Sequence, residues 1–404
     1  MSPDRTAATA SVHEVGVICA LGSGAAALRA ALAPERPAAL PVHSPFWPAA
    51  VPQGLVAEPL PSLDAYPLPL RTRCNALLLA CYRQIETAVR AAIARHGAAR
   101  VAIVLGTSTS GIGEAQQAFT RRAADGALPA EFDLDQQGLG TPADFLAAAS
   151  GARGPAHAIS TACTSAPKAL ASAARLLAAD LADVVIAGGV DALNRFTLAG
   201  FDALACVSRK PCNPMSVNRD GINMGEGAAL FLMSREPGAI RLAGWGESSD
   251  AHHFSAPDPQ GGGALLAMRA ALAMARAEPA DIDYINLHGT ATPQNDAMES
   301  HVVASLFGDR TPCSSTKPLT GHALGAAGAI EAAICCEVLR QGREQGGAAL
   351  PPHWWDGEAD PALPRLALVA PGARAARAPR RVLSNSFAFG GSNAALVLEC
   401  GDAG

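Results

Sequence analysis

Short apolar runs alternate with longer alanine-rich segments along most of this 404-residue chain, and this alternation restricts the possible folds. The short runs are typical of buried strands, whereas the alanine-rich segments have the length and composition of helices. A chain in which such strands and helices alternate is expected to form an α/β fold with packed sheets. The expected strands are 101–105, 184–189, 230–233, 284–287 and 394–398, and the expected helices include 167–177 and 325–339.

The composition allows a large buried core and restricts the class of partner. Hydrophobic residues make up 49% of the chain and charged residues only 17%. A chain of this length holds one large or two ordinary domains. The formal net charge of −5 argues against nucleic acid as the main partner. No stretch has the length and apolar character of a membrane helix, and the N-terminus does not resemble a secretion signal.

The ten cysteines are expected to be free thiols in a reducing cytoplasm. They form no CxxC pair, and no two of them have the spacing of a zinc site, so we expect no bound metal. Most of them lie in apolar runs, as Cys335 and Cys336 do. Such cysteines usually act as small buried hydrophobic side chains.

Cys163 has a different setting, in the run STACTSA at residues 160–166. Residues 156–159 before it have the pattern of a short strand, and residues 167–177 after it predict a helix. The cysteine should therefore lie at or just before a helix N-terminus, where free N–H groups and the helix dipole favour a thiolate. We expect a nucleophile with a lowered pKa; the alternative is an inert buried thiol.

Two histidines far along the chain suit thioester chemistry at this cysteine. His288 begins the run HGTAT directly after the strand expected at 284–287. His322 ends the run STKPLTGH at residues 315–322. Acyl transfer from a thioester needs a thiolate nucleophile, together with groups that manage protons and negative charge around it. A cysteine and two histidines, each at the end of a strand, can meet both needs.

Four motifs together resemble the β-ketoacyl-acyl carrier protein synthases, the condensing enzymes of fatty acid and polyketide synthesis in the thiolase superfamily. The motifs are TACTSA at 161–166, HGTAT at 288–292, KPLTGH at 317–322 with GAAG at 325–328, and NSFAFGGSN at 385–393. The resemblance implies a duplicated thiolase fold with five layers, αβαβα. An N-terminal half (1–240) would carry the nucleophile, and a C-terminal half (241–404) would carry the histidines.

The resemblance also implies an activity, the decarboxylative Claisen condensation of malonyl-acyl carrier protein with an acyl group held on Cys163. The backbone N–H groups of Cys163 and Phe389 would form the oxyanion hole. His288 and His322 would donate hydrogen bonds to the malonyl thioester carbonyl and stabilise the enolate, which requires an N–H on the ring atom that faces the substrate.

Three further residues are expected to support this site. Lys317 should orient the site electrostatically, in a pair with Glu299. Asp296 and Glu299 are three residues apart, so they share a face of a helix that begins near Asn295. We expect both carboxylates to act behind the residues that contact the substrate.

The substrate pocket is expected to include Ile222, Phe387, Thr107 and Ser110. Fatty acid synthases of this type typically carry Phe after Arg-Asp-Gly, where this chain has Ile222. The run GTSTSGIG at 106–113 also departs from their usual pattern. These departures indicate a specialised synthase, such as an aryl polyene or type II polyketide ketosynthase.

The expected partner is an acyl carrier protein, whose phosphopantetheine would carry the substrates, so no further cofactor is expected. Because the chain and such carriers are both acidic, a local basic patch must dock the carrier. The candidate docking residues are Arg71, Arg73, Arg121, Arg122, Arg209 and Lys210. We also expect a homodimer, or a heterodimer with a related ketosynthase-like subunit, with a strand such as 184–189 pairing across a two-fold axis.

The main alternative is a non-catalytic partner of the chain-length-factor type, which pairs with an active ketosynthase but lacks the nucleophile. A thiolase would need a second cysteine in a C-terminal Cys-x-Gly motif, which Cys400 does not provide. A type III synthase would combine cysteine and histidine with asparagine. The local signatures of cysteine hydrolases are absent.

Overall fold

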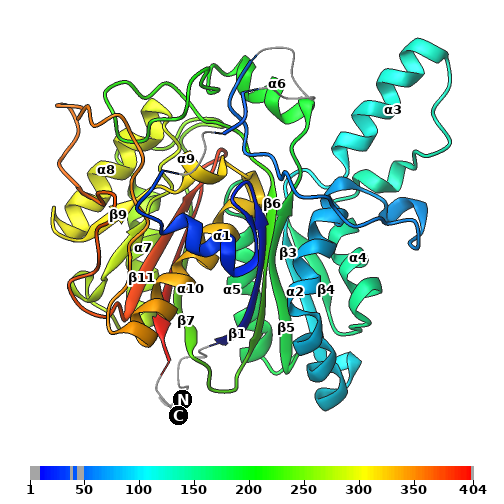
Figure 1. The fold of residues 1–404 in the computed structure, drawn as a ribbon, viewed down its shortest axis with the longest axis horizontal. Helices are drawn as coiled ribbons and strands as arrows, with labels where there is room; N and C mark the ends of the chain where they lie inside the picture. Colours follow the sequence, from blue (N-terminus) through cyan, green and yellow to red (C-terminus); the bar gives the residue numbers. More distant parts are fainter. Residues whose placement is uncertain (1–9, 37–39, 43–49, 402–404) are drawn as a thin grey trace.

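The computed structural model describes residues 10–36, 40–42 and 50–401 (Figure 1). The strands are β1 (Ala10–Cys19), β2 (Gly22–Ser23), β3 (Val101–Gly106), β4 (Ala156–Ile159), β5 (Val184–Asp191), β6 (Gly227–Ser234), β7 (Ile240–Ser249), β8 (Tyr284–Asn286), β9 (Pro312–Ser314), β10 (Ala367–Leu368), β11 (Arg381–Phe387) and β12 (Ser392–Cys400). The α-helices are α1 (Gly24–Ala31), α2 (Arg73–His96), α3 (Ile112–Asp125), α4 (Thr141–Ser150), α5 (Ser165–Ala178), α6 (Arg195–Ala203), α7 (Gly262–Ala275), α8 (Pro293–Phe307), α9 (Lys317–Thr320) and α10 (Ala327–Gln345).

The sheet consists of two parts with the same topology. Across the sheet the order is β10-β9-β8-β11-β12-β7-β1-β6-β5-β3-β4. In the N-terminal part, β3 is parallel to both β4 and β5, and β6 is antiparallel to both β5 and β1. In the C-terminal part, β8 is parallel to β9 and β11, and β12 is antiparallel to β11 and β7. This repeat confirms the duplicated thiolase fold expected from the sequence.

Helices form three layers around the two parts of the sheet. In Figure 1, α7 and α8 lie to the left, α2 and α4 to the right, and α5 and α10 between them. Each layer has its own core of buried side chains: one core lies around α2 and α4, a second around α5 and α10, and a third around α7 and α8. With the strands, these helices give the five layers αβαβα.

The central layer is built from small side chains that let α5 and α10 approach closely. Cys335 and Cys336 on α10 are fully buried there, as the sequence indicated. A Cβ atom added to Gly328 would lie 2.4 Å from Pro167 Cγ. Because protein interiors are close-packed, this contact fixes how near the two helices can lie.

Most of the elements expected from the sequence are present, but one expected role is wrong. The strand expected at 184–189 is β5, which lies between β3 and β6 and is hydrogen-bonded to both. It therefore has no free edge with which to pair across a two-fold axis. The free edge of the N-terminal part is β4, which is paired only with β3 among the described strands.

The chain passes from β6 to β7 between residues 234 and 240, and the division into 1–240 and 241–404 stays a prediction. No helix among the described residues is long and apolar enough to cross a membrane.

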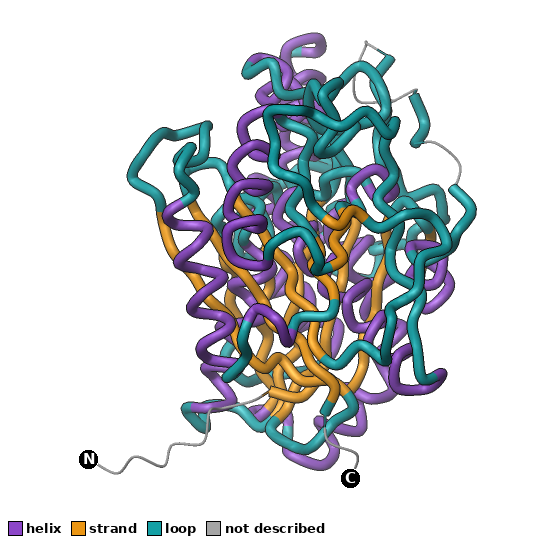
Figure 2. Tube along the Cα trace, turned by 90° about the vertical axis from the view of Figure 1, so that its left-hand side faces the viewer, coloured by secondary structure: helices purple, strands orange, loops and turns teal. Residues whose placement is uncertain are grey.

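The parallel strands point their carboxyl ends to the same side of the molecule, where loops gather at the top of Figures 1 and 2. Cys163 follows β4, His288 follows β8, His322 follows β9 and Phe389 follows β11. Ligands of α/β sheets commonly bind in such loops at the carboxyl ends of strands. The topology thus brings the residues singled out in the sequence to one end of the sheet.

Candidate active site

Cys163 lies in a tight turn directly before α5, where the sequence placed it. Ala162, the residue before it, has a left-handed backbone with φ of 52°. The Ser165 hydroxyl holds this turn by donating to the Ala162 carbonyl (2.6 Å) and accepting from the Thr161 N–H (2.9 Å). Left-handed geometry is costly for alanine, so the turn is a strained element of the kind found at functional sites.

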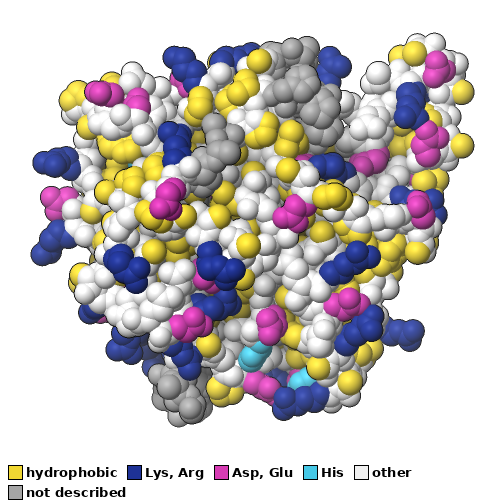
Figure 3. All heavy atoms as spheres, viewed as in Figure 1, with side chains coloured by type: hydrophobic (Ala, Val, Ile, Leu, Met, Phe, Trp, Pro, Cys, Tyr) yellow, Lys and Arg dark blue, Asp and Glu magenta, His cyan; other side chains and the backbone are white. Residues whose placement is uncertain are grey.

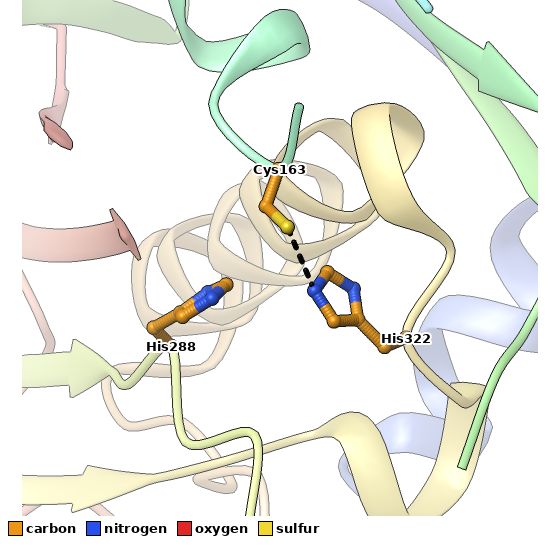
Figure 4. Close-up of side chains that lie close together, drawn as sticks. All are labelled: Cys163, His288 and His322. Atoms are coloured by element: carbon orange, nitrogen blue, oxygen red, sulfur yellow. Dashed lines mark hydrogen bonds between the residues drawn. The ribbon is translucent and has the colours of Figure 1, made fainter. Parts of the chain in front are cut away.

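The two histidines come from the C-terminal part of the chain and meet Cys163 (Figure 4). Nε2 of His322 lies 3.1 Å from the Cys163 sulfur. The ring of His288 lies beside that of His322, with the centroids 5.3 Å apart and the planes at 85°. A sulfur and two imidazoles from opposite halves of the fold thus form one buried cluster.

The neighbours of the two rings decide where their protons lie. Nδ1 of His322 accepts a hydrogen bond from the Leu324 N–H at 3.2 Å. Nδ1 of His288 lies 3.4 Å from the Lys317 ammonium nitrogen, which can only donate. Burial, and secondly the Lys317 charge, lower the pKa of both histidines well below the usual value. Both rings are therefore neutral, with the proton on Nε2.

Both Nε2 atoms are therefore hydrogen-bond donors. The Cys163 sulfur and the two imidazoles have the composition of a metal site, and one ligand atom from each lies within 4.8 Å of the others. A metal ligand must offer a lone pair, however, and these Nε2 atoms carry protons. The arrangement suits a developing negative charge better than it suits a cation.

The expected low pKa of Cys163 is wrong for this structure. Burial raises the pKa of the thiol to about 12, although the Lys317 ammonium pulls it in the opposite direction. The side chain is only 4% exposed. Loss of hydration penalises a buried thiolate, and this penalty outweighs the helix N-terminus on which the expectation rested.

Lys317 is buried in the site, but its partner is not the expected Glu299. The Lys317 ammonium lies 2.5 Å from a carboxylate oxygen of Glu331 and 2.5 Å from the His288 carbonyl oxygen. Glu331 is an acidic residue inside the apolar helix α10. Buried charges are normally paired, so an isolated acidic residue in an apolar helix indicates a buried partner of opposite charge. This was the sequence signal that could have identified Glu331 as the partner of Lys317.

Glu299 and Asp296 hold the loop that carries His288. Glu299 accepts hydrogen bonds from the N–H groups of His288 and Gly289, both at 2.7 Å. Asp296 accepts from the Met215 N–H at 2.8 Å and the Ala291 N–H at 3.2 Å. Burial raises the pKa of Glu299 to about 7. Neither carboxylate is among the residues that line the cavity at Cys163, and their supporting role stays a prediction.

A cavity opens beside Cys163, and two of the four expected pocket residues line it. Ile222 and Phe387 do so, together with His288 and His322. The rest of its wall is formed by Phe201, Leu204, Cys206, Ser255, Ala256, Pro257, Thr290, Thr292, Gln294, Asn295, Ala388 and Phe389. The segments around residues 201–206 and 255–257 carry no catalytic motif, so no pattern in the sequence indicated that they reach the site.

Thr107 and Ser110 do not line this cavity, which corrects the expectation for both. The Thr107 hydroxyl donates to Asp191 at 2.8 Å, and the Ser110 hydroxyl donates to the Gly138 carbonyl at 2.8 Å. Asp191 ends β5 and also accepts from the Gly325 N–H at 2.6 Å. This carboxylate, which sequence reasoning missed, joins the loop after β3 to the segment before α10.

The turn at Phe389 is shaped for a free backbone N–H group. Gly390 and Gly391 both have positive φ, 83° and 79°. A Cβ atom on Gly391 would lie 2.4 Å from the Asp250 carbonyl oxygen. Among the described residues, neither the Phe389 N–H nor the Cys163 N–H donates to a backbone carbonyl. Both groups are therefore free to bind an oxyanion.

The candidate docking residues differ in how they are bound. Arg73 forms an ion pair with the fully buried Glu226, which gives it a structural role. Arg71 donates to the Tyr66 and Asp64 carbonyls. The remaining candidates are exposed: Arg121 pairs with Glu131, Arg122 lies beside it on α3, Arg209 pairs with Asp202, and Lys210 follows Arg209.

Acidic and basic side chains are interspersed on the face drawn in Figure 3. The described side chains on that face form no broad basic field. On this face, an acidic partner would have to dock on a small group of basic side chains.

A thiol nucleophile and two proton-bearing imidazoles in a duplicated thiolase fold define the condensing-enzyme class. Two family models, the N-terminal and C-terminal domains of beta-ketoacyl synthase, match residues 72–239 and 240–344. The chain belongs to the beta-ketoacyl synthase family.

Individual relatives agree with this assignment. The chain is 39% identical over 266 residues to 3-oxoacyl-[acyl-carrier-protein] synthase 2 of Rhizobium meliloti, a match that covers 61% of each protein. It is 31% identical over 402 residues to nodulation protein E of Rhizobium leguminosarum bv. trifolii, covering 95% of this chain and 97% of that one.

A similar solved structure is the ketosynthase ApeO in complex with its chain length factor ApeC from Xenorhabdus doucetiae. The matched chain is 40% identical to this one with a TM-score of 0.91, and the match covers 99% of both chains.

Proposed function

We propose that this chain is a β-ketoacyl-acyl carrier protein synthase that joins an acyl group on Cys163 to a malonyl group with loss of CO₂. The proposal rests mainly on the geometry of Cys163, His288 and His322. The Cys163 sulfur lies 3.1 Å from Nε2 of His322, and the contacts at Nδ1 of His288 and His322 leave both Nε2–H groups facing the site.

In the first half-reaction, Cys163 attacks the carbonyl carbon of an acyl thioester. The carbon–sulfur bond to the carrier breaks, a new one forms to Cys163, and the net proton transfer is from the Cys163 thiol to the departing thiol. The N–H groups of Cys163 and Phe389 would hold the oxyanion of the tetrahedral intermediate. The Nε2–H of His322 donates toward sulfur, which stabilises the thiolate form that must react.

In the second half-reaction, the carbon–carboxylate bond of the malonyl thioester breaks and releases CO₂. Its electron pair moves toward the thioester oxygen, which becomes an enolate oxygen. Two neutral imidazoles that present N–H groups can hold this charge without giving up a proton. The enolate carbon then attacks the acyl carbonyl of Cys163, and the carbon–sulfur bond breaks to return the thiolate.

Lys317 supports this chemistry from behind His288. Its ammonium group fixes the tautomer at His288 Nδ1 and donates to the His288 carbonyl, while Glu331 balances its charge. A positive group one imidazole away also favours the enolate and the thiolate.

Release of CO₂ from radiolabelled malonyl-carrier, with and without an acyl donor, tests the proposed reaction. A condensing enzyme should release CO₂ and form a β-ketoacyl carrier when the acyl donor is present. A non-catalytic partner of the chain-length-factor type should form no product, and a hydrolase should release free acid. We favour the catalytic assignment because Cys163, His288 and His322 are all present.

We further propose that the substrates arrive on the phosphopantetheine of an acyl carrier protein, which the name of the Rhizobium meliloti relative suggests. Neither of the two half-reactions needs an additional cofactor. Ile222, which is buried and lines the cavity where fatty acid synthases carry Phe, supports a specialised pathway such as aryl polyene or type II polyketide synthesis.

A ketosynthase-like second subunit is the proposed protein partner. The ketosynthase ApeO forms a complex with its chain length factor. The edge of β4 that pairs with no other described strand offers backbone groups that a strand of a second subunit could satisfy. Sedimentation of the chain alone and after co-expression with such a subunit distinguishes a homodimer from a heterodimer; a stable monomer in both would contradict the proposal.

A further inference from the structure

The two turns that carry the proposed oxyanion donors are joined by side-chain hydroxyls. Thr164 directly follows Cys163, and Ser392 lies three residues after Phe389. Their hydroxyl oxygens are 2.8 Å apart. The backbone carbonyl of Ser392 also accepts from the Ala388 N–H at 2.7 Å and closes the Phe389 turn. Ser392 therefore contacts both the turn that carries the Cys163 N–H and the turn that carries the Phe389 N–H.

Lys168 completes this contact from α5. Its ammonium nitrogen lies 2.7 Å from the Ser392 hydroxyl oxygen. Lys168 is four residues after Thr164, so the two side chains lie on one face of the helix start. The charges of Glu247 and Arg175 act on Lys168 in opposite directions, and these two residues pair with each other at 2.5 Å.

A donor-only group at one end and an acceptor-only group at the other set the directions of the hydrogen bonds that join Lys168, Ser392, Thr164 and Thr161. An ammonium group only donates, so the Ser392 oxygen accepts from Lys168. The Thr161 carbonyl only accepts, so the Thr164 hydroxyl, 2.7 Å away, donates to it, and the Thr161 hydroxyl oxygen lies 2.9 Å from the same Thr164 oxygen. The Ser392 proton is then left for the Thr164 oxygen. Without Lys168, the Ser392 hydroxyl could rotate and the link between the turns would lose its orientation.

We propose that Lys168 is a positioning residue, which acts through Ser392 to hold the Phe389 N–H in register with the Cys163 N–H. Lys168 does not line the catalytic cavity, and its charge is not among the main influences on the Cys163 thiol. Its effect should therefore fall on steps that form an oxyanion, and not on the reactivity of the sulfur itself. The inference rests on the proposed condensing function.

Two reactions of Cys163 distinguish an effect on the oxyanion from an effect on the reactivity of the sulfur. Acyl transfer from a small acyl-pantetheine thioester passes through a tetrahedral oxyanion, whereas alkylation by iodoacetamide does not. Lys168→Met should slow acyl transfer about tenfold through kcat with KM unchanged, because small displacements of positioned groups are costly. Alkylation should keep the wild-type rate. Lys168→Arg, which keeps a charged donor, should recover most of the lost kcat.

A double-mutant cycle tests whether Lys168 acts through Ser392. Ser392→Ala should slow acyl transfer, and adding Lys168→Met to it should cause little further loss, because residues in one network are not additive. The matched control is Arg175→Met on the same helix, which does not touch Ser392 and should transfer at the wild-type rate. Unfolding curves of each variant verify that it is folded.

Three results would overturn the inference: wild-type acyl transfer by Lys168→Met, equal slowing of alkylation and transfer, or additive losses in the double variant. If the wild-type chain itself takes up no acyl group, the proposed function fails instead. The two failures are thus distinguishable in the same experiment.

Discussion

At the scale of single residues, the chemistry depends on which atoms carry protons. The contact of His322 Nδ1 with the Leu324 N–H and that of His288 Nδ1 with the Lys317 ammonium leave both Nε2 atoms as donors. The same burial that keeps these rings neutral also disfavours a resting thiolate at Cys163. The resting site is therefore nearly uncharged at its centre, and charge develops only during the reaction.

The histidines are predicted to matter most for decarboxylation. His288→Ala and His322→Ala should each lower the rate of CO₂ release from malonyl-carrier about 100-fold, the usual scale for losing one oxyanion donor. Gln in place of either histidine should recover part of this loss, because its side-chain amide can donate from a similar position. The control is His301→Ala on α8, where the histidine is exposed, and it should release CO₂ at the wild-type rate. Wild-type decarboxylation by an alanine variant would make that histidine structural.

The raised pKa of Cys163 predicts a steep pH dependence for alkylation. Burial disfavours the charged form and raises the pKa to about 12, so thiolate is scarce near neutral pH and increases as pH rises. The rate of iodoacetamide labelling of Cys163, followed by peptide mass spectrometry, should therefore rise about tenfold per pH unit between about pH 7 and 9. A rate that levels off near neutral pH would show that the helix N-terminus outweighs burial.

At the scale of elements, the site depends on how closely α5 and α10 pack. Helix α5 begins two residues after Cys163, and α10 follows the segment that carries His322. Gly328 of α10 and Pro167 of α5 form the contact between them. This helix–helix contact in the core therefore contributes to the placement of the sulfur relative to the imidazole, together with the backbone hydrogen bonds of His322 to the 223–225 segment.

Gly328→Ala should disturb stability and activity together. The added methyl would lie 2.4 Å from Pro167 Cγ. Overpacking of this kind costs about 1–3 kcal/mol, which urea unfolding would measure. The displaced α5 should also lower kcat. In the control Gly346→Ala, the methyl would enter open space, so only backbone strain is expected there and kcat should stay unchanged. If Gly328→Ala and Gly346→Ala have the same kcat, the contact between α5 and α10 does not affect catalysis.

The sequence predicted the elements that carry the site, because each follows a clear pattern. The strands before Cys163 and His288 and the helix after Cys163 all form as expected. It did not predict the partner of Lys317, because Glu331 is 14 residues away. Asp191 and Ser392 were missed for the same reason: long-range contacts of polar side chains leave no periodic signal.

At the scale of the whole molecule, the duplicated fold places the nucleophile on one half and the proton-bearing imidazoles on the other. Neither half contains the complete site. Access to it runs through the cavity lined by Phe201, Leu204 and Cys206 on one side. The exposed Arg209 and Lys210 follow this wall within a few residues. This proximity makes them the best-placed pair of the candidate docking residues.

Reversal of this pair should weaken carrier binding without affecting the chemistry. Arg209→Glu with Lys210→Glu should raise KM for an acyl carrier protein and reduce its dependence on salt, because fewer charge contacts remain to be screened. Turnover of a small acyl-pantetheine thioester should stay unchanged. Arg121→Glu with Arg122→Glu on α3 is the matched control. An equal loss of activity on the carrier protein and on the small thioester would show that Arg209 and Lys210 support the fold and do not dock the carrier.

Intact-protein mass spectrometry of the chain after incubation with an acyl-pantetheine thioester tests most directly whether Cys163 is the acylated nucleophile. We predict one acyl adduct, located on Cys163 and absent in Cys163→Ala, that malonyl-carrier discharges with release of CO₂ and formation of a β-ketoacyl carrier. An adduct on another residue, no adduct at all, or discharge to the free acid would contradict the proposal that Cys163, His288 and His322 form the site of a condensing enzyme.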